Sequence, residues 1–258
     1  MANQFLVKET MAAMRGLPAA EITALQNGTY EGVQLLGYYE KGDTPAPIIY
    51  YLAPTTPDPG PDDGGSVIAI GQIKLEAAFP SGVDCKCFGA QRSDILPESE
   101  VISIFENWQN YINSTDGKYF APTKSATTYR LYKPLYIQKS FICQEDMPVW
   151  MYLSTAVGKV VHPTATTFDG RFDFNVKAVM GINPLTYSDS QDRLRFKNIK
   201  ILCTNGDDDT IASQDIGVYF PLGTSFEMDN ITVIRPNLYG FEFKENWMGI
   251  LKRLYYCC

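Results

Sequence analysis

The aspartate and glutamate residues of this sequence carry the side chains that could cleave a glycosidic bond. Hydrolysis of a glycosidic bond uses two carboxyl groups on either side of that bond, and a lyase would set a basic residue beside its acids. The candidate acids in the second half of the chain are Asp173, Asp192, Asp229, Glu242 and Glu245. In the stacked arrangement argued for below, no two of them occupy neighbouring coils of one column. We therefore predict no catalytic residue within these 258 residues.

Glu242 has a tyrosine 23 positions before it, which is one step of the repeat. Tyr219 would lie directly beneath Glu242 in the stack, and a tyrosine offers a large ring with a polar end on which a sugar could rest. A glutamate beside a tyrosine is also common on ordinary protein surfaces. Tyr219 and Glu242 are our candidate glycan-binding residues.

The residue types present give little support to a bound metal or cofactor. Asn205-Gly206-Asp207-Asp208-Asp209 could offer oxygen ligands to Ca²⁺, but it lacks the alternating spacing and the final glutamate of a known calcium loop, which favours a solvated acidic loop. His162 is the only histidine, so a histidine-based metal site or a Ser-His-Asp triad is hard to build. The six cysteines contain no CxxC pair and indicate thiols in a protein made in a reducing compartment. We predict no metal and no cofactor.

The elements that must position these residues repeat along the last third of the chain. Four segments share one alternating apolar pattern: 174–179, 197–202, 229–234 and 252–257. Asn175 and Asn198 lie 23 residues apart, as do Asn230 and Arg253, whereas the step between Asn198 and Asn230 is 32 residues. A fixed period of this length indicates stacked supersecondary units, one of which carries an insertion.

Each unit contains strand-like residues without a helical period, so we interpret the segment as a parallel β-helix. Gly217 and Gly240 repeat the same 23-residue step in a second phase. Two apolar columns are expected, the first with Val176, Ile199, Ile231 and Leu254 and the second with Ala178, Ile201, Val233 and Tyr256. At a neighbouring position the amides of Asn175, Asn198 and Asn230 are expected to hydrogen bond from coil to coil.

A helix is predicted over residues 97–113, where apolar residues recur at helical spacing. We expect this helix to cover the open end of the β-helix, because an end coil exposes apolar side chains and an unpaired strand edge. A shorter helix is expected over 17–26, and residues 54–65, rich in proline and glycine, are expected to form a loop. Strands are expected over 33–39, 48–52, 66–70, 83–90, 118–120, 129–131 and 135–137.

Charge and apolar patterning exclude two classes of partner. The formal net charge is −7 and the isoelectric point is about 4.8, which argues against nucleic acid and anionic membranes. The start of the chain lacks the pattern of a secretory signal, and no apolar run approaches the length of a membrane span. We therefore predict no nucleic-acid binding and no membrane insertion.

Four short motifs occur in a fixed order along the chain. They are Gly37-Tyr38-Tyr39 with Gly42-Asp43, the segment DDGGSVI at 62–68, the segment VDCKCFGA at 83–90, and KYFAP at 118–122 followed by TYRL at 128–131 and PLYI at 134–137. Together with the period, this order resembles the proximal part of bacteriophage tailspikes with a pectate-lyase-like right-handed parallel β-helix. The resemblance runs from about residue 33 to the end.

The sequence departs from that family pattern at two places. SDILPES at 93–99 stands where the family usually has an Asp-Asp-Thr cluster, and Thr44-Pro45-Ala46-Pro47 replaces the glycines that normally follow Gly-Asp. The helix still begins at the expected place, so the architecture is little affected. The loop geometry near Asp43 is the feature that the second departure puts in doubt.

The resemblance implies a mainly β chain that forms a homotrimer in the phage virion and is made in the bacterial host cytoplasm. It further implies docking to phage tail or baseplate proteins through the N-terminal part and binding of host-surface polysaccharide through a distal region. The expected divisions are a virion-attachment segment over 1–32, a small β-rich neck over 33–82, the first β-helix strand with a capping helix over 83–134, and β-helix coils over 135–258.

Three functional hypotheses follow. The first is a structural virion protein, the proximal part of a tailspike or tail fibre. The second is a polysaccharide lyase or hydrolase acting on capsular or pectin-like glycan, against which the scattered acids weigh. The third is a bacterial surface adhesin, against which the missing secretory pattern weighs. Because the last repeat stops mid-coil at Cys258, we also expect a longer protein or a partner that covers this end.

Overall fold

The computed structural model describes residues 4–79, 82–114, 128–143, 149–152, 176–182, 194–203 and 214–257. The chain divides into two compact units, residues 1–91 and 92–258. Several sequence predictions lie outside the described residues: those for Asn175, Asp173, Asp192 and His162, for the acidic loop at 205–209, and for a strand at 118–120.

The first unit is built on a five-stranded sheet in the order β1-β2-β3-β5-β4. Its strands are β1 (Phe5–Lys8), β2 (Gly32–Leu35), β3 (Ile48–Leu52), β4 (Val67–Ile70) and β5 (Ile73–Ala78), and two short helices, α1 (Met11–Arg15) and α2 (Ala19–Gln26), connect β1 to β2. β1 pairs in parallel with β2, while the other pairs are antiparallel. The parallel pairing of β1 with β2 runs across the boundary predicted after residue 32, and that division stays a prediction.

The carboxylate of Asp43 organises the chain that leaves β2. It accepts hydrogen bonds from the backbone N–H groups of Tyr38 (2.6 Å), Tyr39 (2.8 Å) and Glu40 (3.1 Å), and from Nε2 of Gln91 (2.8 Å). These bonds turn residues 36–39 away from the sheet, so the predicted strand 33–39 ends at Leu35. In this chain the aspartate of the Gly-Asp motif therefore holds the turn, with Thr44-Pro45-Ala46-Pro47 after it.

The prediction of a strand over 83–90 is wrong. Residues Cys85–Phe88 and Ala90–Arg92 form two short 3₁₀ helices, η1 and η2. The side chain of Asp84 accepts a hydrogen bond from the N–H of Lys86 (2.8 Å) and begins the first turn, and Gly89 ends it with a positive φ of 96°. The alternation of the letters VDCKCF suggested a strand, but the local capping residues decide the conformation.

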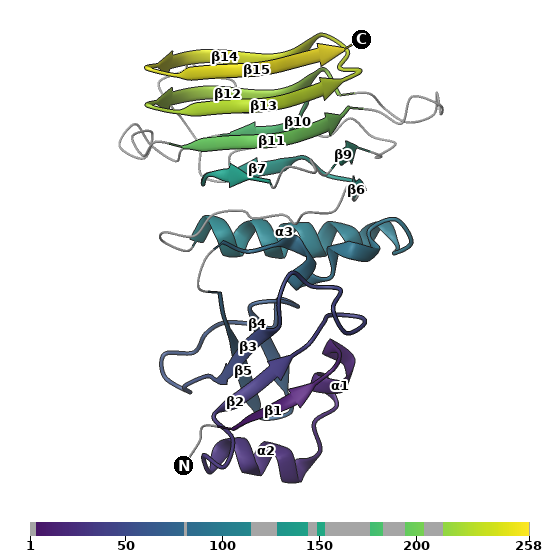
Figure 1. The fold of residues 1–258 in the computed structure, drawn as a ribbon, viewed down its shortest axis with the longest axis vertical. Helices are drawn as coiled ribbons and strands as arrows, with labels where there is room; N and C mark the ends of the chain where they lie inside the picture. Colours follow the sequence, from purple (N-terminus) through teal and green to yellow (C-terminus); the bar gives the residue numbers. More distant parts are fainter. Residues whose placement is uncertain are drawn as a thin grey trace. The chain divides into compact units, whose positions relative to one another are not determined.

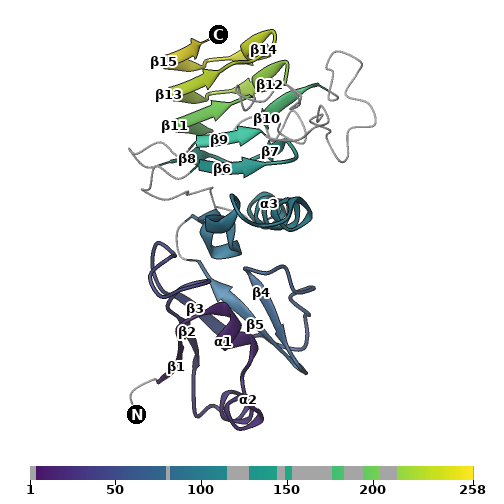
Figure 2. The same cartoon turned by 90° about the vertical axis from the view of Figure 1, so that its right-hand side faces the viewer.

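The second unit is a parallel β-helix (Figures 1 and 2). Its strands are β6 (Thr128–Leu131), β7 (Leu135–Ile137), β8 (Phe141–Ile142), β9 (Val149–Tyr152), β10 (Ala178–Ile182), β11 (Arg195–Leu202), β12 (Ile216–Thr224), β13 (Glu227–Ile234), β14 (Tyr239–Trp247) and β15 (Ile250–Cys257). From β10 to β15 consecutive strands alternate between two sheets, in the orders β14-β12-β10-β7 and β15-β13-β11-β9-β6, with β8 also pairing with β11. All described pairs are parallel.

The predicted columns are present in part. Ile199, Ile231 and Leu254 follow one another in register, as do Ile201, Val233 and Tyr256. Ala178, however, belongs to the other sheet, where it pairs with Ile216, and Val176, two residues before it, packs against the cluster formed by Tyr136, Ala178, Ile216 and Tyr219. The position below Ile201 is occupied by Trp150. Because strands of both sheets share the same apolar alternation, the period alone could not assign Val176 and Ala178 to a sheet.

The repeated glycines mark a close approach between the two sheets. A Cβ on Gly217 would overlap the side chain of Val233, and one on Gly240 would lie 2.9 Å from Cβ of Tyr256. Val233 and Tyr256 are themselves neighbours in register, so each coil repeats the same contact. This contact explains why glycine recurs every 23 residues at these positions.

Helix α3 (Glu98–Ser114) covers the first coil, as the sequence predicted. Its apolar face contributes Phe105 and Trp108 to an aromatic cluster with side chains from the first strands. The ring of Trp150 stacks on Trp108, with centroids 5.9 Å apart, and on Tyr129, with centroids 4.8 Å apart. Figure 2 shows the helix lying beside β6 and β7 at the end of the stack opposite β14 and β15.

Candidate functional site

The predicted pair Tyr219 and Glu242 occupies one column of the second unit. Tyr219 lies on β12 and is in register with Glu242 on β14. Tyr219 is only 1 % exposed, so its ring is part of the buried cluster on this sheet and presents no open face to a sugar. The carboxylate of Glu242 pairs with Lys244, two residues further along the same strand. Sugar stacking on Tyr219 therefore does not fit this structure, and glycan binding by Glu242 stays a prediction.

The other described acids of the β-helix are held by cations on neighbouring coils. Lys197, Asp229 and Lys252 follow one another in register, as expected. The ion pairs cross between columns, because Glu227 lies 3.3 Å from Lys197 and 3.4 Å from Lys252. The hydrogen bond from Lys197, together with that from Lys252, lowers the pKa of Glu227 below its ordinary value. Such a ladder of alternating charge supports stacking of coils.

Asp229 has a geometry of its own in this ladder. Nε and Nη2 of Arg253 each donate to one oxygen of the Asp229 carboxylate at 2.8 Å, which makes the pair bidentate. This hydrogen bond holds the pKa of Asp229 below its ordinary value. Asp229 and Glu242 lie on different sheets, and Glu245 is described in its backbone only. The described residues thus bring no two of the candidate acids into one column.

The asparagines form the ladder that the repeat suggested, over the two coils that the structure describes. Nδ2 of Asn230 donates to Oδ1 of Asn198 at 2.9 Å, and Nδ2 of Asn198 donates to the carbonyl of Cys143 at 3.0 Å. Both residues have a positive φ, 56° for Asn230 and 57° for Asn198, a conformation that asparagine tolerates better than most residues. The next coil has Arg253 at this position, also with a positive φ of 47°. These residues shape the bend of each coil and leave no open amide for a ligand.

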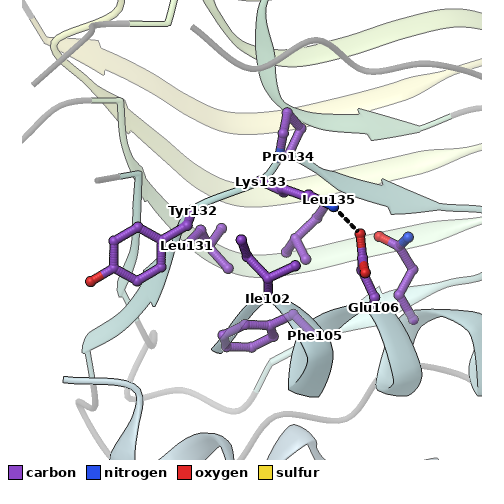
Figure 3. A pocket seen from close by; sticks show the side chains of 9 residues that line it. Ile102, Phe105, Glu106, Leu131, Tyr132, Lys133, Pro134 and Leu135 are labelled. Atoms are coloured by element: carbon purple, nitrogen blue, oxygen red, sulfur yellow. Dashed lines mark hydrogen bonds and ion pairs between the residues drawn. The ribbon is translucent and has the colours of Figure 1, made fainter. Parts of the chain in front are cut away.

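A small pocket lies between helix α3 and the link from β6 to β7 (Figure 3). Its volume is about 60 Å³, and its floor is apolar, with Phe105 and Leu135 among the lining residues. Nζ of Lys133 lies 2.6 Å from Oε1 of Glu106 at its edge. Pockets for drug-sized ligands typically measure roughly 300–1,000 Å³. This pocket can therefore hold a few water molecules but no sugar ring.

Within the same described residues there is neither a metal-ligating cluster nor a helix that could span a membrane. No group of three or more histidine, cysteine, aspartate or glutamate side chains there could hold a metal ion. Among the helices of that part of the chain, none is both long and apolar enough to cross a membrane.

The comparisons with known proteins concern the fold. No protein-family model matches the chain, and no curated protein sequence matches it. The solved tailspike gp42 of Acinetobacter phage vb_AbaP_AS12 superposes with a TM-score of 0.61 at 15 % sequence identity, over 97 % of this chain and 39 % of that one.

Two further solved tailspikes match with lower TM-scores. The tailspike protein of Acinetobacter baumannii phage AM24 gives 0.45 at 10 % identity, over 96 % of this chain and 42 % of the other. Tailspike protein 2 of the Escherichia coli O157:H7 bacteriophage CAB120 gives 0.42 at 9 % identity, over 95 % and 36 %. The chain thus spans about two fifths of the length of the solved structures it matches. In its fold, this chain resembles the bacteriophage tailspikes.

Proposed function

We propose that this chain is the proximal part of a phage tailspike or tail fibre, a structural virion protein that joins the phage tail to a distal glycan-binding region. The observation that carries the proposal is the fold shared with the tailspike of Acinetobacter phage vb_AbaP_AS12 over 97 % of this chain and 39 % of that protein. Residues 1–32 would contribute the attachment to tail or baseplate proteins. The protein would be made in the host cytoplasm and assembled into the tail.

The chemistry of the β-helix surface supports a structural role. The described acids of its coils are bound to lysine or arginine, as shown for Glu227, Asp229 and Glu242. A hydrolase or lyase of this architecture would need acids that face a bound sugar and can exchange protons with it. Side chains committed to ion pairs between coils instead hold the stack together.

The surface of the last described coil supports a further contact along the axis of the stack. Four of its large apolar side chains are about half exposed: Ile250, Leu251, Tyr255 and Tyr256. Met248, at the turn before β15, is 74 % exposed. Apolar surface concentrated on one coil is the kind that another coil buries, since each coil of a solenoid covers its neighbour. A distal region that continues the stack would supply such a cover.

Sedimentation velocity and mass photometry of the 258-residue chain at low concentration test the predicted homotrimer. A stable trimer supports the proposal and places trimer contacts within this chain, whereas a monomer contradicts it for these residues. In parallel, the chain is incubated with purified bacterial capsular polysaccharides, and release of reducing ends or unsaturated sugars is measured. Products formed by the wild-type chain, and lost in Glu242→Gln or Asp229→Asn, would establish a depolymerase instead.

A further inference from the structure

The outer edge of β7 faces helix α3. In its sheet β7 pairs with β10 through the register Leu135–Met180, Tyr136–Gly181 and Ile137–Ile182. Within the described residues β7 is the last strand of this sheet. An edge of this kind presents backbone N–H and C=O groups to which another strand can add.

Two amide side chains of α3 bind the backbone groups on that edge. The N–H of Tyr136 donates to Oε1 of Gln109. Nδ2 of Asn113 donates to the carbonyl of Tyr136 at 2.9 Å, and the N–H of Gln138 donates to Oδ1 of Asn113 at 3.0 Å. Along the edge the helix thus offers an acceptor, a donor and a second acceptor.

This sequence of partners is the one that a neighbouring parallel strand supplies. In a parallel ladder, the C=O of one residue on the added strand accepts from the N–H of a residue on the edge strand. The residue two positions later on the added strand donates its N–H to the C=O of that same edge residue, and its own C=O accepts from the N–H two residues further along the edge. Gln109 takes the place of the first residue, and Asn113, with both its donor and its acceptor, takes the place of the second.

The geometry of the two elements makes the match possible. Four residues of an α-helix advance by about 6 Å, and two residues of a parallel strand advance by about 6.6 Å. Residues 109 and 113 therefore face one side of the helix at nearly the spacing of Tyr136 and Gln138. The ion pair between Glu106 and Lys133, 2.6 Å long, lies one turn earlier and fixes the register in the same direction.

We propose that Gln109 and Asn113 act as a surrogate parallel strand that closes the edge of β7 against strand addition. Apolar packing of α3 alone would cover the aromatic cluster but leave three edge groups without partners. The two amides satisfy these groups, and the strand they exclude is one from a second copy of this chain, which carries the same edge.

The test compares Asn113→Leu with Asn110→Leu in the 258-residue chain. Asn110 lies on the same helix and is exposed, so its variant makes the same chemical change away from the edge. Hydrogen exchange of the amides of Tyr136 and Gln138 should accelerate at least tenfold in Asn113→Leu and stay at the wild-type rate in Asn110→Leu. Sedimentation velocity should show species larger than those of the wild type in Asn113→Leu alone.

A second pair of variants tests the order of donors and acceptors. Gln109→Glu keeps an acceptor for the N–H of Tyr136 and should retain its protection, whereas Gln109→Leu should lose it. This pair also carries the test if Asn113→Leu does not fold, because Gln109 makes one of the three edge bonds. The proposal is overturned if exchange in Asn113→Leu and Gln109→Leu stays at the wild-type rate. It is equally overturned if the edge opens but self-association matches that of Asn110→Leu.

Discussion

Replacement of Asn230 separates two contributions to the stability of the coil stack. Asn230→Gly removes the hydrogen bond to Asn198 but keeps the positive φ of 56° accessible. Asn230→Ala removes the same bond and also forces a residue with a Cβ into the left-handed region. The difference between the two variants is therefore the cost of the left-handed conformation for alanine minus the entropic penalty of glycine.

The expected magnitudes follow from the lost interactions. An amide hydrogen bond contributes about 0.5–1.5 kcal/mol net, and a flexible glycine adds about 0.5–1 kcal/mol, so Asn230→Gly should destabilise by about 1–2.5 kcal/mol. A left-handed conformation costs an ordinary residue about 1–2 kcal/mol, so Asn230→Ala should destabilise by about 1.5–3.5 kcal/mol. Because the lost hydrogen bond is common to both variants, the difference in their free energy of unfolding is expected to be about 0.5–1 kcal/mol.

Urea unfolding followed by tryptophan fluorescence measures these differences. Trp108 and Trp150 are fully buried in the same unit as Asn230 and should report its unfolding. The midpoints should shift at constant slope with urea concentration if the variants change stability alone. Asn198→Gly, alone and combined with Asn230→Gly, completes a cycle whose coupling energy should be at least about 0.5 kcal/mol. A coupling near zero, or equal stability of the Gly and Ala variants, would refute the argument.

Three further predictions concern other positions. Asp43→Ala should destabilise the first unit by about 3 kcal/mol, because three backbone N–H groups lose their acceptor; accelerated hydrogen exchange at Tyr38–Glu40 would show it, and wild-type exchange there would contradict it. Gly217→Ala should lower the unfolding midpoint of its unit far more than Gly16→Ala lowers that of the first unit, since a Cβ at 217 overlaps Val233, while Gly16 has a negative φ of −91° and a Cβ there would lie 3.4 Å or more from its neighbours; similar losses would remove the close approach as the reason for the glycine. Burial raises the pKa of Asp62, but hydrogen bonds from Arg15 and from the N–H groups of Ala69 and Gly64 outweigh burial and lower the pKa below 3.8. The stability that this carboxylate contributes is therefore present above pH 3.8 and is lost as the pH falls through the lowered pKa. In a profile of melting temperature against pH, Asp62→Asn should flatten the decline at acid pH.

Sequence patterns predicted the helices and strands that the local spacing of apolar side chains determines. The apolar face of residues 98–114 requires a helix with one buried side, and that helix lies on the first coil. Ile231 and Leu254 were placed in one column because their 23-residue spacing matches a coil without insertion. These predictions depend on local periodicity, which the sequence displays directly.

Other features depend on pairing between strands that are distant in the chain, which the amino-acid sequence does not reveal. Val176 was assigned to the column of Ile199 because both sheets share the same alternation. β1 and α1 were missed since each is short, and β1 becomes a strand only by pairing with β2, over twenty residues later. The surrogate strand on α3 was also missed: Gln109 and Asn113 read as ordinary polar positions until the edge of β7 is placed beside them.

Stacking also determines where a functional site of this chain could be recognised. The recurring residues serve the coil itself: Gly217 and Gly240 permit close approach, and Asn198 and Asn230 hold the bend. Recurrence therefore marks structure and not ligand binding. A ligand-binding residue would lie at an outward-facing position where the residue type differs from that of the repeat, because packing between coils does not restrict the side chain there. Arg253 departs in this way, but its guanidinium is bound to Asp229. This departure, in the described coils, thus still serves the stack, as the proposed proximal and structural role would require.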